Sequence, residues 1–205
     1  MKQTSSIGHP AEASVFLLDW DGILADTRLN FARLRNKYFG GKIVPLFESA
    51  AALPEPDRSL ILAEIRKIEI EGADSATAVE GAKDLIAWLA ETRMPWAVIS
   101  RNCLDSIILA AERCGIILPP VTLSREDPYV KPDPMALKLA AEKLGAALSG
   151  CIMVGDFIYD LEAAQNAGIP SVLVRTKTGA EWEEGADFAY ATVREFVEDL
   201  RSFGT

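Results

Sequence analysis

Short apolar runs alternate with amphipathic segments along most of this chain, a pattern typical of strands that are covered by helices. Each run is short and bounded by polar residues or glycine, so it predicts a buried strand. Strands are expected at residues 15–18, 96–100, 121–123, 151–154 and 171–174, with a shorter one at 188–190. Helical spacing covers residues 104–114, 134–144, 160–167 and 193–203. The alternation predicts an α/β fold whose parallel sheet is covered on both faces.

Residues 27–79 show a different pattern, with little strand character and three amphipathic stretches. Helices are expected at residues 29–38, 47–53 and 57–71, with Gly72 ending the third. The chain therefore divides into a core of residues 1–26 and 80–205 and a small helical cap of residues 27–79. On this interpretation the cap is inserted after the first strand of the core.

Polar side chains stand where three of the predicted strands end. Asp19 and Asp21 follow the first strand, Ser100 ends the second, and Asp156 follows the strand at 151–154. Ligands of open parallel sheets bind beyond the carboxyl ends of the strands, so these side chains are expected to face one crevice. Converging carboxylates repel each other unless a cation lies between them or one of them is protonated. The aspartate pair thus predicts a metal site, an acid/base pair or both, or else only a turn, which Asp and Gly also favour.

Composition narrows the function classes. The chain has 205 residues, 49% of them hydrophobic, which is enough for a sizeable core. Its net charge of -9 argues against a nucleic-acid or anionic-membrane partner, although a local cation could still attract an anionic small substrate. The chain has three cysteines, none of them in a C-x-x-C pair, and a single histidine. This content argues against a zinc site built from Cys and His. Without a predicted signal peptide or membrane span, the protein is expected to be soluble and cytoplasmic.

Four motifs in a fixed order carry a resemblance to a known family. They are Asp19-x-Asp21, Ser100, Lys131 within Val-Lys-Pro-Asp-Pro, and Asp156 to Asp160 within Gly-Asp-Phe-Ile-Tyr-Asp. Together they resemble the haloacid dehalogenase-like hydrolase superfamily, and within it the phosphoglycolate phosphatase-like branch. The resemblance covers roughly residues 14–200. It implies a Rossmann-like core with a helical cap and a phosphatase that acts on a small phosphomonoester, such as phosphoglycolate or a sugar phosphate.

The resemblance also implies a role for each acidic residue. Asp19 matches the nucleophile, which would form an aspartyl-phosphate. Asp21 matches the general acid/base, and its main-chain carbonyl would bind Mg²⁺. Asp156 matches the second carboxylate that binds Mg²⁺, together with Asp19. Asp160 matches the last motif residue, either a water-mediated metal ligand or an orienting partner.

The same resemblance implies the groups that would hold the phosphate. Ser100 would hydrogen-bond a phosphate oxygen, with the main-chain N–H groups of Arg101 and Asn102 nearby. Lys131 would offset negative charge on the phosphate and on Asp19. Simpler roles are open for the same residues, because Ser100 and Asp156 are good helix caps and a lysine is usually solvated.

Several alternatives are open at this point. A phosphomutase of the same fold would return the phosphoryl group to substrate instead of water. A non-catalytic protein that binds a phosphorylated ligand is a second alternative, and a phosphonate hydrolase would need a cap lysine such as Lys37 or Lys42. A dehalogenase is disfavoured, because that chemistry would need neither Asp21 nor Asp156. The sequence leaves the natural substrate and the oligomeric state open.

The cap is short for this branch, which leaves its choice of substrate open. Most of its basic residues are expected to lie on solvated helix faces, with one or two as candidates for contact with a carboxylate or a sugar. These residues are Arg28, Arg33, Arg35, Lys37, Lys42, Arg58, Arg66 and Lys67.

Overall fold

A six-stranded parallel sheet forms the centre of the molecule in the computed structural model, which describes residues 7–175 and 180–203. The strand order is β5-β4-β1-β6-β7-β8. The strands are β1 (Val15–Leu18), β4 (Trp96–Ile99), β5 (Thr122–Leu123), β6 (Cys151–Gly155), β7 (Ser171–Val174) and β8 (Phe188–Tyr190). In the register, Leu17 of β1 lies opposite Ala97 of β4 and Met153 of β6. The predicted α/β fold with a parallel sheet is confirmed.

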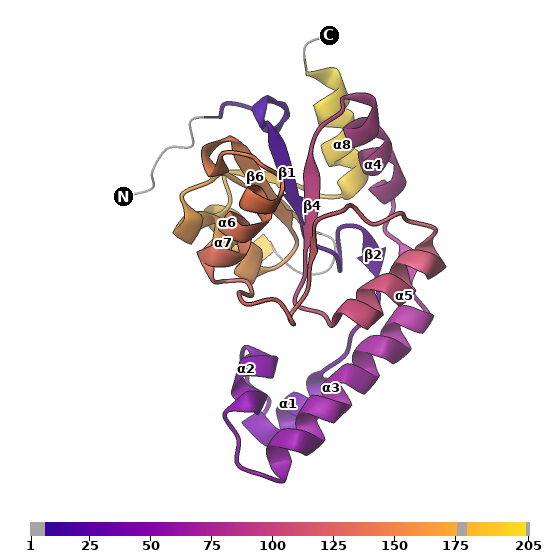
Figure 1. Cartoon of the computed structure of the whole chain (residues 1–205), viewed down its shortest axis with the longest axis vertical. Helices are drawn as coiled ribbons and strands as arrows, with labels where there is room; N and C mark the ends of the chain where they lie inside the picture. The colour runs from indigo at the N-terminus through magenta and orange to yellow at the C-terminus, as the bar shows by residue number, and fades with distance from the viewer. Residues whose placement is uncertain (1–6, 176–179, 204–205) are drawn as a thin grey trace.

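Helices cover both faces of this sheet (Figure 1). One face carries α4 (Ala82–Glu91), α5 (Leu104–Cys114) and α8 (Val193–Ser202), and the other carries α6 (Pro134–Lys143) and α7 (Ile158–Ala167). The side chains of β1 alternate between them, with Phe16 and Leu18 in the first core and Val15 and Leu17 in the second. Both sets are buried, which explains why β1 is apolar at every position. Three 3-10 helices, Pro10–Glu12, Leu148–Gly150 and Ala180–Gly185, complete this part of the chain.

Helix α4 was not predicted from the pattern, although its buried side has helical spacing. Trp88 and Leu89 follow Leu85 by three and four residues, and all three face the core. The helix begins after Gly81, whose φ of 90° is a conformation that residues with a Cβ adopt at a cost.

The segment between β1 and α4 forms a separate group of helices beyond the carboxyl ends of β1 and β4, at the bottom of Figure 1. It contains α1 (Ala32–Phe39), α2 (Leu46–Ala51) and α3 (Asp57–Asp74). Leu34, Ile61 and Ile65 lie in a small core of their own. An antiparallel pair, β2 (Ala25–Asp26) and β3 (Thr77–Ala78), which the sequence did not predict, joins the two ends of the segment. The boundaries of the cap at residues 27 and 79 remain an interpretation of the sequence.

The predicted end of the third cap helix at Gly72 is wrong, because α3 continues to Asp74. A Cβ at Gly72 would lie 2.5 Å from the carbonyl oxygen of Thr27 and 3.0 Å from Leu29 Cδ2. The glycine therefore allows the chain that enters the cap to cross close to α3, and does not end the helix.

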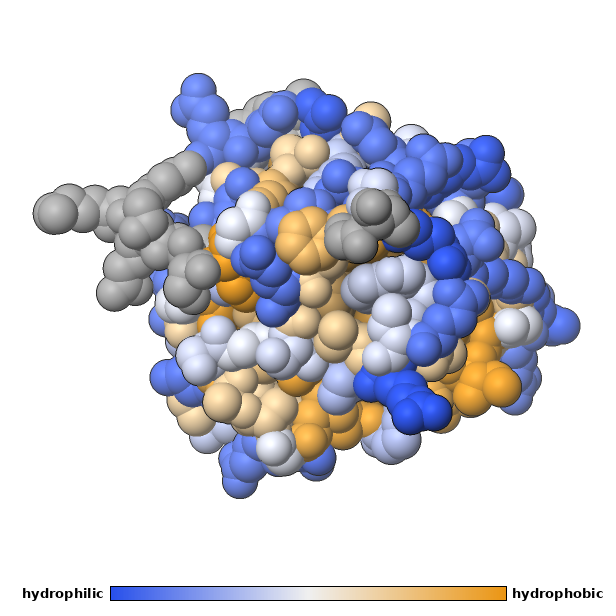
Figure 2. Space-filling model, turned by 90° about the horizontal axis from the view of Figure 1, so that it is seen from above, coloured by the Kyte–Doolittle hydropathy of each residue, from blue (hydrophilic) through white to orange (hydrophobic). Residues whose placement is uncertain are grey.

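The view from above shows hydrophobic residues in separate patches between hydrophilic ones (Figure 2). In the described ranges, 7–175 and 180–203, no helix combines the length and apolar composition that crossing a membrane requires.

Substituting Gly72→Ala should lower the free energy of unfolding by about 1–3 kcal/mol, because the new methyl group would press on the main chain of Thr27. In an unobstructed helix the same change would stabilise by about 1 kcal/mol, so the sign of the effect is decisive. Urea denaturation of both proteins measures it. A more stable Gly72→Ala variant would contradict the close approach.

Candidate active site

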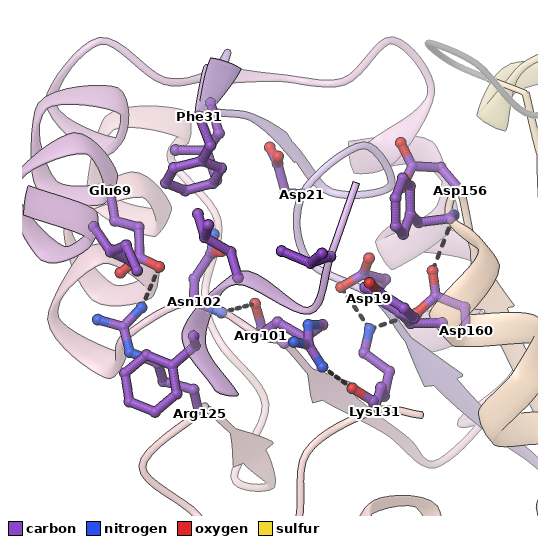
Figure 3. A pocket seen from close by; sticks show the side chains of 18 of the residues that line it. Asp19, Asp21, Phe31, Glu69, Arg101, Asn102, Arg125, Lys131, Asp156 and Asp160 are labelled. Carbon is purple, nitrogen blue, oxygen red and sulfur yellow. Dashed lines mark hydrogen bonds and ion pairs between the residues drawn. The ribbon is translucent and has the colours of Figure 1, made fainter. Parts of the chain in front are cut away.

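The polar residues at the strand ends line one cavity of about 440 Å³. Asp19 and Asp21 reach it from the end of β1, Ser100 from β4, and Asp156 from β6. Figure 3 shows Asp19, Lys131 and Asp160 together at one side of this cavity, with Asp156 beside them. The crevice that the strand-end positions predict is thus present in the structure.

A buried lysine joins two of these carboxylates. Lys131 is 1% exposed, and its Nζ lies 2.8 Å from Asp19 Oδ1 and 2.6 Å from Asp160 Oδ1. Burial by itself would lower the pKa of this ammonium group, but the charges of Asp160 and Asp19 outweigh it and the pKa is raised. Lys131 is therefore a fixed positive charge in the floor of the cavity. A solvated role for this residue is wrong.

Asp19 lies in a crowded and mostly buried position. Burial, followed by the charge of Asp160, raises its pKa to about 6, while Lys131 and a 2.7 Å hydrogen bond from the N–H of Trp20 lower it. The raised pKa means that Lys131 and the Trp20 N–H do not fully stabilise the negative charge of this carboxylate. The environment of Asp19 thus favours a further positive charge.

Three carboxylates provide donors for such a cation. One oxygen from each of Asp19, Asp156 and Asp160 lies within 4.8 Å of the other two. Two glycines make this crowding possible, because a Cβ at Gly22 would collide with the carboxylate of Asp156 and one at Gly155 with that of Asp160. An all-oxygen set of this kind suits Mg²⁺, which takes few carboxylates together with water and phosphate oxygens.

Asp160 has a partner for each of its oxygens. Oδ1 accepts from Lys131, and Oδ2 accepts the N–H of Phe157 at 3.1 Å in the first turn of α7. Neither Ser100 nor Asp156 is a helix cap, since Cys103 precedes α5 and Phe157 precedes α7. The simpler capping role that each of these two residues allowed is thus not the one observed.

The carboxylate of Asp21 is held by Thr27, the residue directly after β2. Its Oδ1 accepts the N–H of Thr27 at 2.9 Å and the hydroxyl of Thr27 at 2.7 Å. Figure 3 shows this side chain apart from the group around Lys131. Asp21 therefore borders the cavity but does not join the carboxylates of Asp19, Asp156 and Asp160.

The predicted phosphate-binding loop after β4 contains one internal hydrogen bond and one bridging arginine. Ser100 is buried, and its Oγ accepts the N–H of Asn102 at 3.1 Å. Arg101 donates to the main-chain carbonyl of Lys131 and, at 2.9 and 2.8 Å, to the two carboxylate oxygens of Glu48 in α2. The Arg101 guanidinium thus links the cap to the loop that carries Lys131.

A second buried ion pair at the cavity was not predicted. Glu69 of α3 pairs with Arg125, and both side chains are nearly inaccessible, at 3% and 6% exposed. Burial raises the pKa of Glu69, although Arg125 and the N–H of Cys103 oppose this. The sequence does contain one sign of a buried partner for Glu69. It lies four residues after the buried Ile65, on the core-facing side of α3.

Comparison with known proteins identifies the family. A model described as haloacid dehalogenase-like hydrolase matches residues 35–174. The chain belongs to this family. Its resemblance to the phosphoglycolate phosphatase-like branch is confirmed as well, through a phosphoglycolate phosphatase of Xanthomonas campestris pv. campestris that is 27% identical over 151 residues. That alignment covers 70% of this chain and 66% of the relative, so the chain spans slightly less than two thirds of it.

Two further similarities extend the comparison. The hexitol phosphatase A of Escherichia coli is 28% identical over 158 residues, covering 69% of this chain and 73% of the relative. A hydrolase from Pseudomonas syringae has a similar fold, with a TM-score of 0.78 at 17% identity over 94% of this chain and 100% of that one. At this identity the structural similarity supports the fold alone.

Replacing Lys131 with Met should destabilise the protein by roughly 3–5 kcal/mol, because it leaves the carboxylates of Asp19 and Asp160 close together without their shared cation. Lys138→Met, at an exposed position of α6, is the matched control and should change stability by less than about 0.5 kcal/mol. Denaturant unfolding checks both. Equal stability of the two variants would show that the buried lysine has no such role.

Proposed function

We propose that this protein is a magnesium-dependent phosphatase that hydrolyses a small phosphorylated metabolite through an aspartyl-phosphate. The observation that carries the proposal is the buried contact of Lys131 with Asp19 and Asp160 beside Asp156, at the end of the central strands. The named activities of its relatives, on phosphoglycolate and on hexitol phosphates, support the same reaction class.

Mg²⁺ would be held by the carboxylates of Asp19 and Asp156 and by the main-chain carbonyl of Asp21. When bound, it would neutralise negative charge on the phosphoryl group and on Asp19. Asp160 orients Lys131 through Oδ1 and accepts the N–H of Phe157 through Oδ2, so it would reach the metal through water and not directly. These contacts support the orienting role and leave the water-mediated one open.

In the first chemical step, a carboxylate oxygen of Asp19 attacks phosphorus and the bond from phosphorus to the substrate's ester oxygen breaks. Asp21 gives a proton to that leaving oxygen. In the second step, Asp21 takes a proton from water, whose oxygen attacks phosphorus and displaces Asp19. Inorganic phosphate and an alcohol leave, and both aspartates return to their starting states.

The remaining residues hold the phosphoryl group without changing covalently. The Lys131 ammonium is placed to bind a phosphoryl oxygen while it keeps Asp19 oriented. The hydroxyl of Ser100 and the main-chain N–H of Arg101 are the neighbouring donors proposed for the other oxygens. Such positioning and charge stabilisation account for most of the catalysis of phosphoryl transfer.

Asp19→Asn should abolish phosphate release from a panel of small phosphomonoesters in the presence of Mg²⁺, with a loss of at least about 1,000-fold, because an amide cannot act as the nucleophile. The fold should remain intact, as monitored by circular dichroism. Asp84→Asn, in the first turn of α4 outside the cavity, is the control and should retain full activity. Undiminished turnover by Asp19→Asn would refute the assigned nucleophile.

If the wild-type protein releases no phosphate from any monoester, a phosphomutase or a binding protein becomes the better explanation. An assay of sugar-phosphate isomerisation separates these two alternatives. A mutase would interconvert the isomers, whereas a binding protein would not.

Mg²⁺ and orthovanadate added together should raise the melting temperature more than the sum of their separate effects, because each ligand supplies the charge that the other needs. Asp156→Asn should remove most of the Mg²⁺-dependent part of this increase. Differential scanning fluorimetry measures the effect. A melting temperature that does not respond to Mg²⁺ would contradict the proposed metal site.

A further inference from the structure

The part of the cavity formed by the cap differs in character from the floor around Lys131. Its walls include the rings of Phe31 and Phe47 and the aliphatic side chains of Val44, Leu46 and Ile65, and the ring of Tyr159 from α7 lines the same cavity. Aromatic and aliphatic walls favour a ligand whose body is apolar or flat, because they remove its surface from water without offering it many polar partners.

One of the guanidinium groups at this wall comes from the cap helix α1. Arg35 of α1 lines the cavity, and its Cζ lies 5.9 Å from the centre of the Phe31 ring. Its Nε is buried without a hydrogen-bond partner in the part of the chain that the structure describes. A buried donor that forms no hydrogen bond is unfavourable for folding, so its presence at a cavity needs a reason.

The other cations of the cavity are each paired with a carboxylate. Arg101 contacts Glu48, and Arg125 contacts Glu69. Lys131 contacts both Asp19 and Asp160. For Arg35, no carboxylate within 4.0 Å is found among the described residues, and its contact there is with the Phe31 ring. Arg35 is thus the cation of this cavity with capacity left for a ligand.

We propose that Arg35 determines substrate choice by binding a second anionic group on the alcohol part of the phosphomonoester, and that this alcohol has an apolar or aromatic body. The inference rests on the proposed phosphatase function, since it assumes that the phosphoryl group lies at Asp19 and Lys131. A guanidinium binds a carboxylate through two parallel hydrogen bonds, which an uncharged group cannot reproduce.

The size of the cavity agrees with such a substrate. Its volume of about 440 Å³ lies in the range of roughly 300–1,000 Å³ that encloses drug-sized ligands. A two-carbon phosphate would leave most of the apolar wall uncovered. The preferred substrate is therefore larger than phosphoglycolate.

The test compares two phosphomonoesters of similar shape, 4-carboxyphenyl phosphate and 4-carbamoylphenyl phosphate. The wild type should hydrolyse the carboxylate with a kcat/KM about tenfold or more above that of the amide, mainly through a lower KM. Arg35→Gln should remove this preference and leave the rate with the amide within about twofold. Arg35→Lys should keep part of the preference, because the charge remains.

Arg33→Gln is the matched control, since Arg33 is exposed on the same helix and does not line the cavity. It should keep the wild-type preference. A wild type without preference, or an Arg35→Gln variant that keeps it, would overturn the inference while leaving the phosphatase proposal intact.

Binding measurements keep the two proposals separate if neither ester is hydrolysed, a result that would count against the phosphatase. The non-hydrolysable 4-carboxybenzyl phosphonate and its 4-carbamoyl analogue are then compared by calorimetry with Mg²⁺ present. Tighter binding of the carboxylate that Arg35→Gln abolishes would support the role of Arg35. Equal binding of the two phosphonates would refute it.

Discussion

The contact of one buried lysine with two aspartates is the interaction on which the rest of the site depends. Lys131 lies on the loop before α6, Asp19 follows β1, and Asp160 belongs to α7, so one ammonium group fixes three separate parts of the core. Burial of such a charge is tolerated only when its partners are close and well oriented. Because buried Lys131 needs its partners close and well oriented, the ion pair also holds Asp19 in one orientation.

This arrangement leaves an excess of negative charge that the protein does not neutralise by itself. Lys131 compensates Asp160 and part of Asp19, while Asp156 approaches the loop after β1 closely enough that only glycine fits at position 22. The raised pKa of Asp19 has the same origin, because burial and Asp160 together outweigh Lys131. Excess charge in a cleft open to ligands is a physical reason for a cation to bind there.

The sequence was sufficient for the sheet and for the residues at its strand ends, because both depend on local patterns. A short apolar run followed by Asp19 and Asp21 defines a strand end without any knowledge of the rest of the fold. The pairing of Glu69 with Arg125 joins residues far apart in the chain, and β2 and β3 are too short to show a pattern. Gly72 was misread for a related reason, since a glycine needed for a close crossing looks in sequence like one that ends a helix.

The core and the cap contribute different kinds of contact to the cavity. The strand ends supply the charged groups at the floor of the cavity, and the ion pairs of Lys131 with Asp19 and Asp160 lie wholly within the core. At the cavity, Arg101 pairs with Glu48 and Arg125 with Glu69 across the cap and the core, so these charges are already compensated before a ligand binds. Under the proposed function, recognition of the alcohol part falls to the side chains of α1 and its neighbours, so substitutions there are expected to change the substrate without disturbing the reaction.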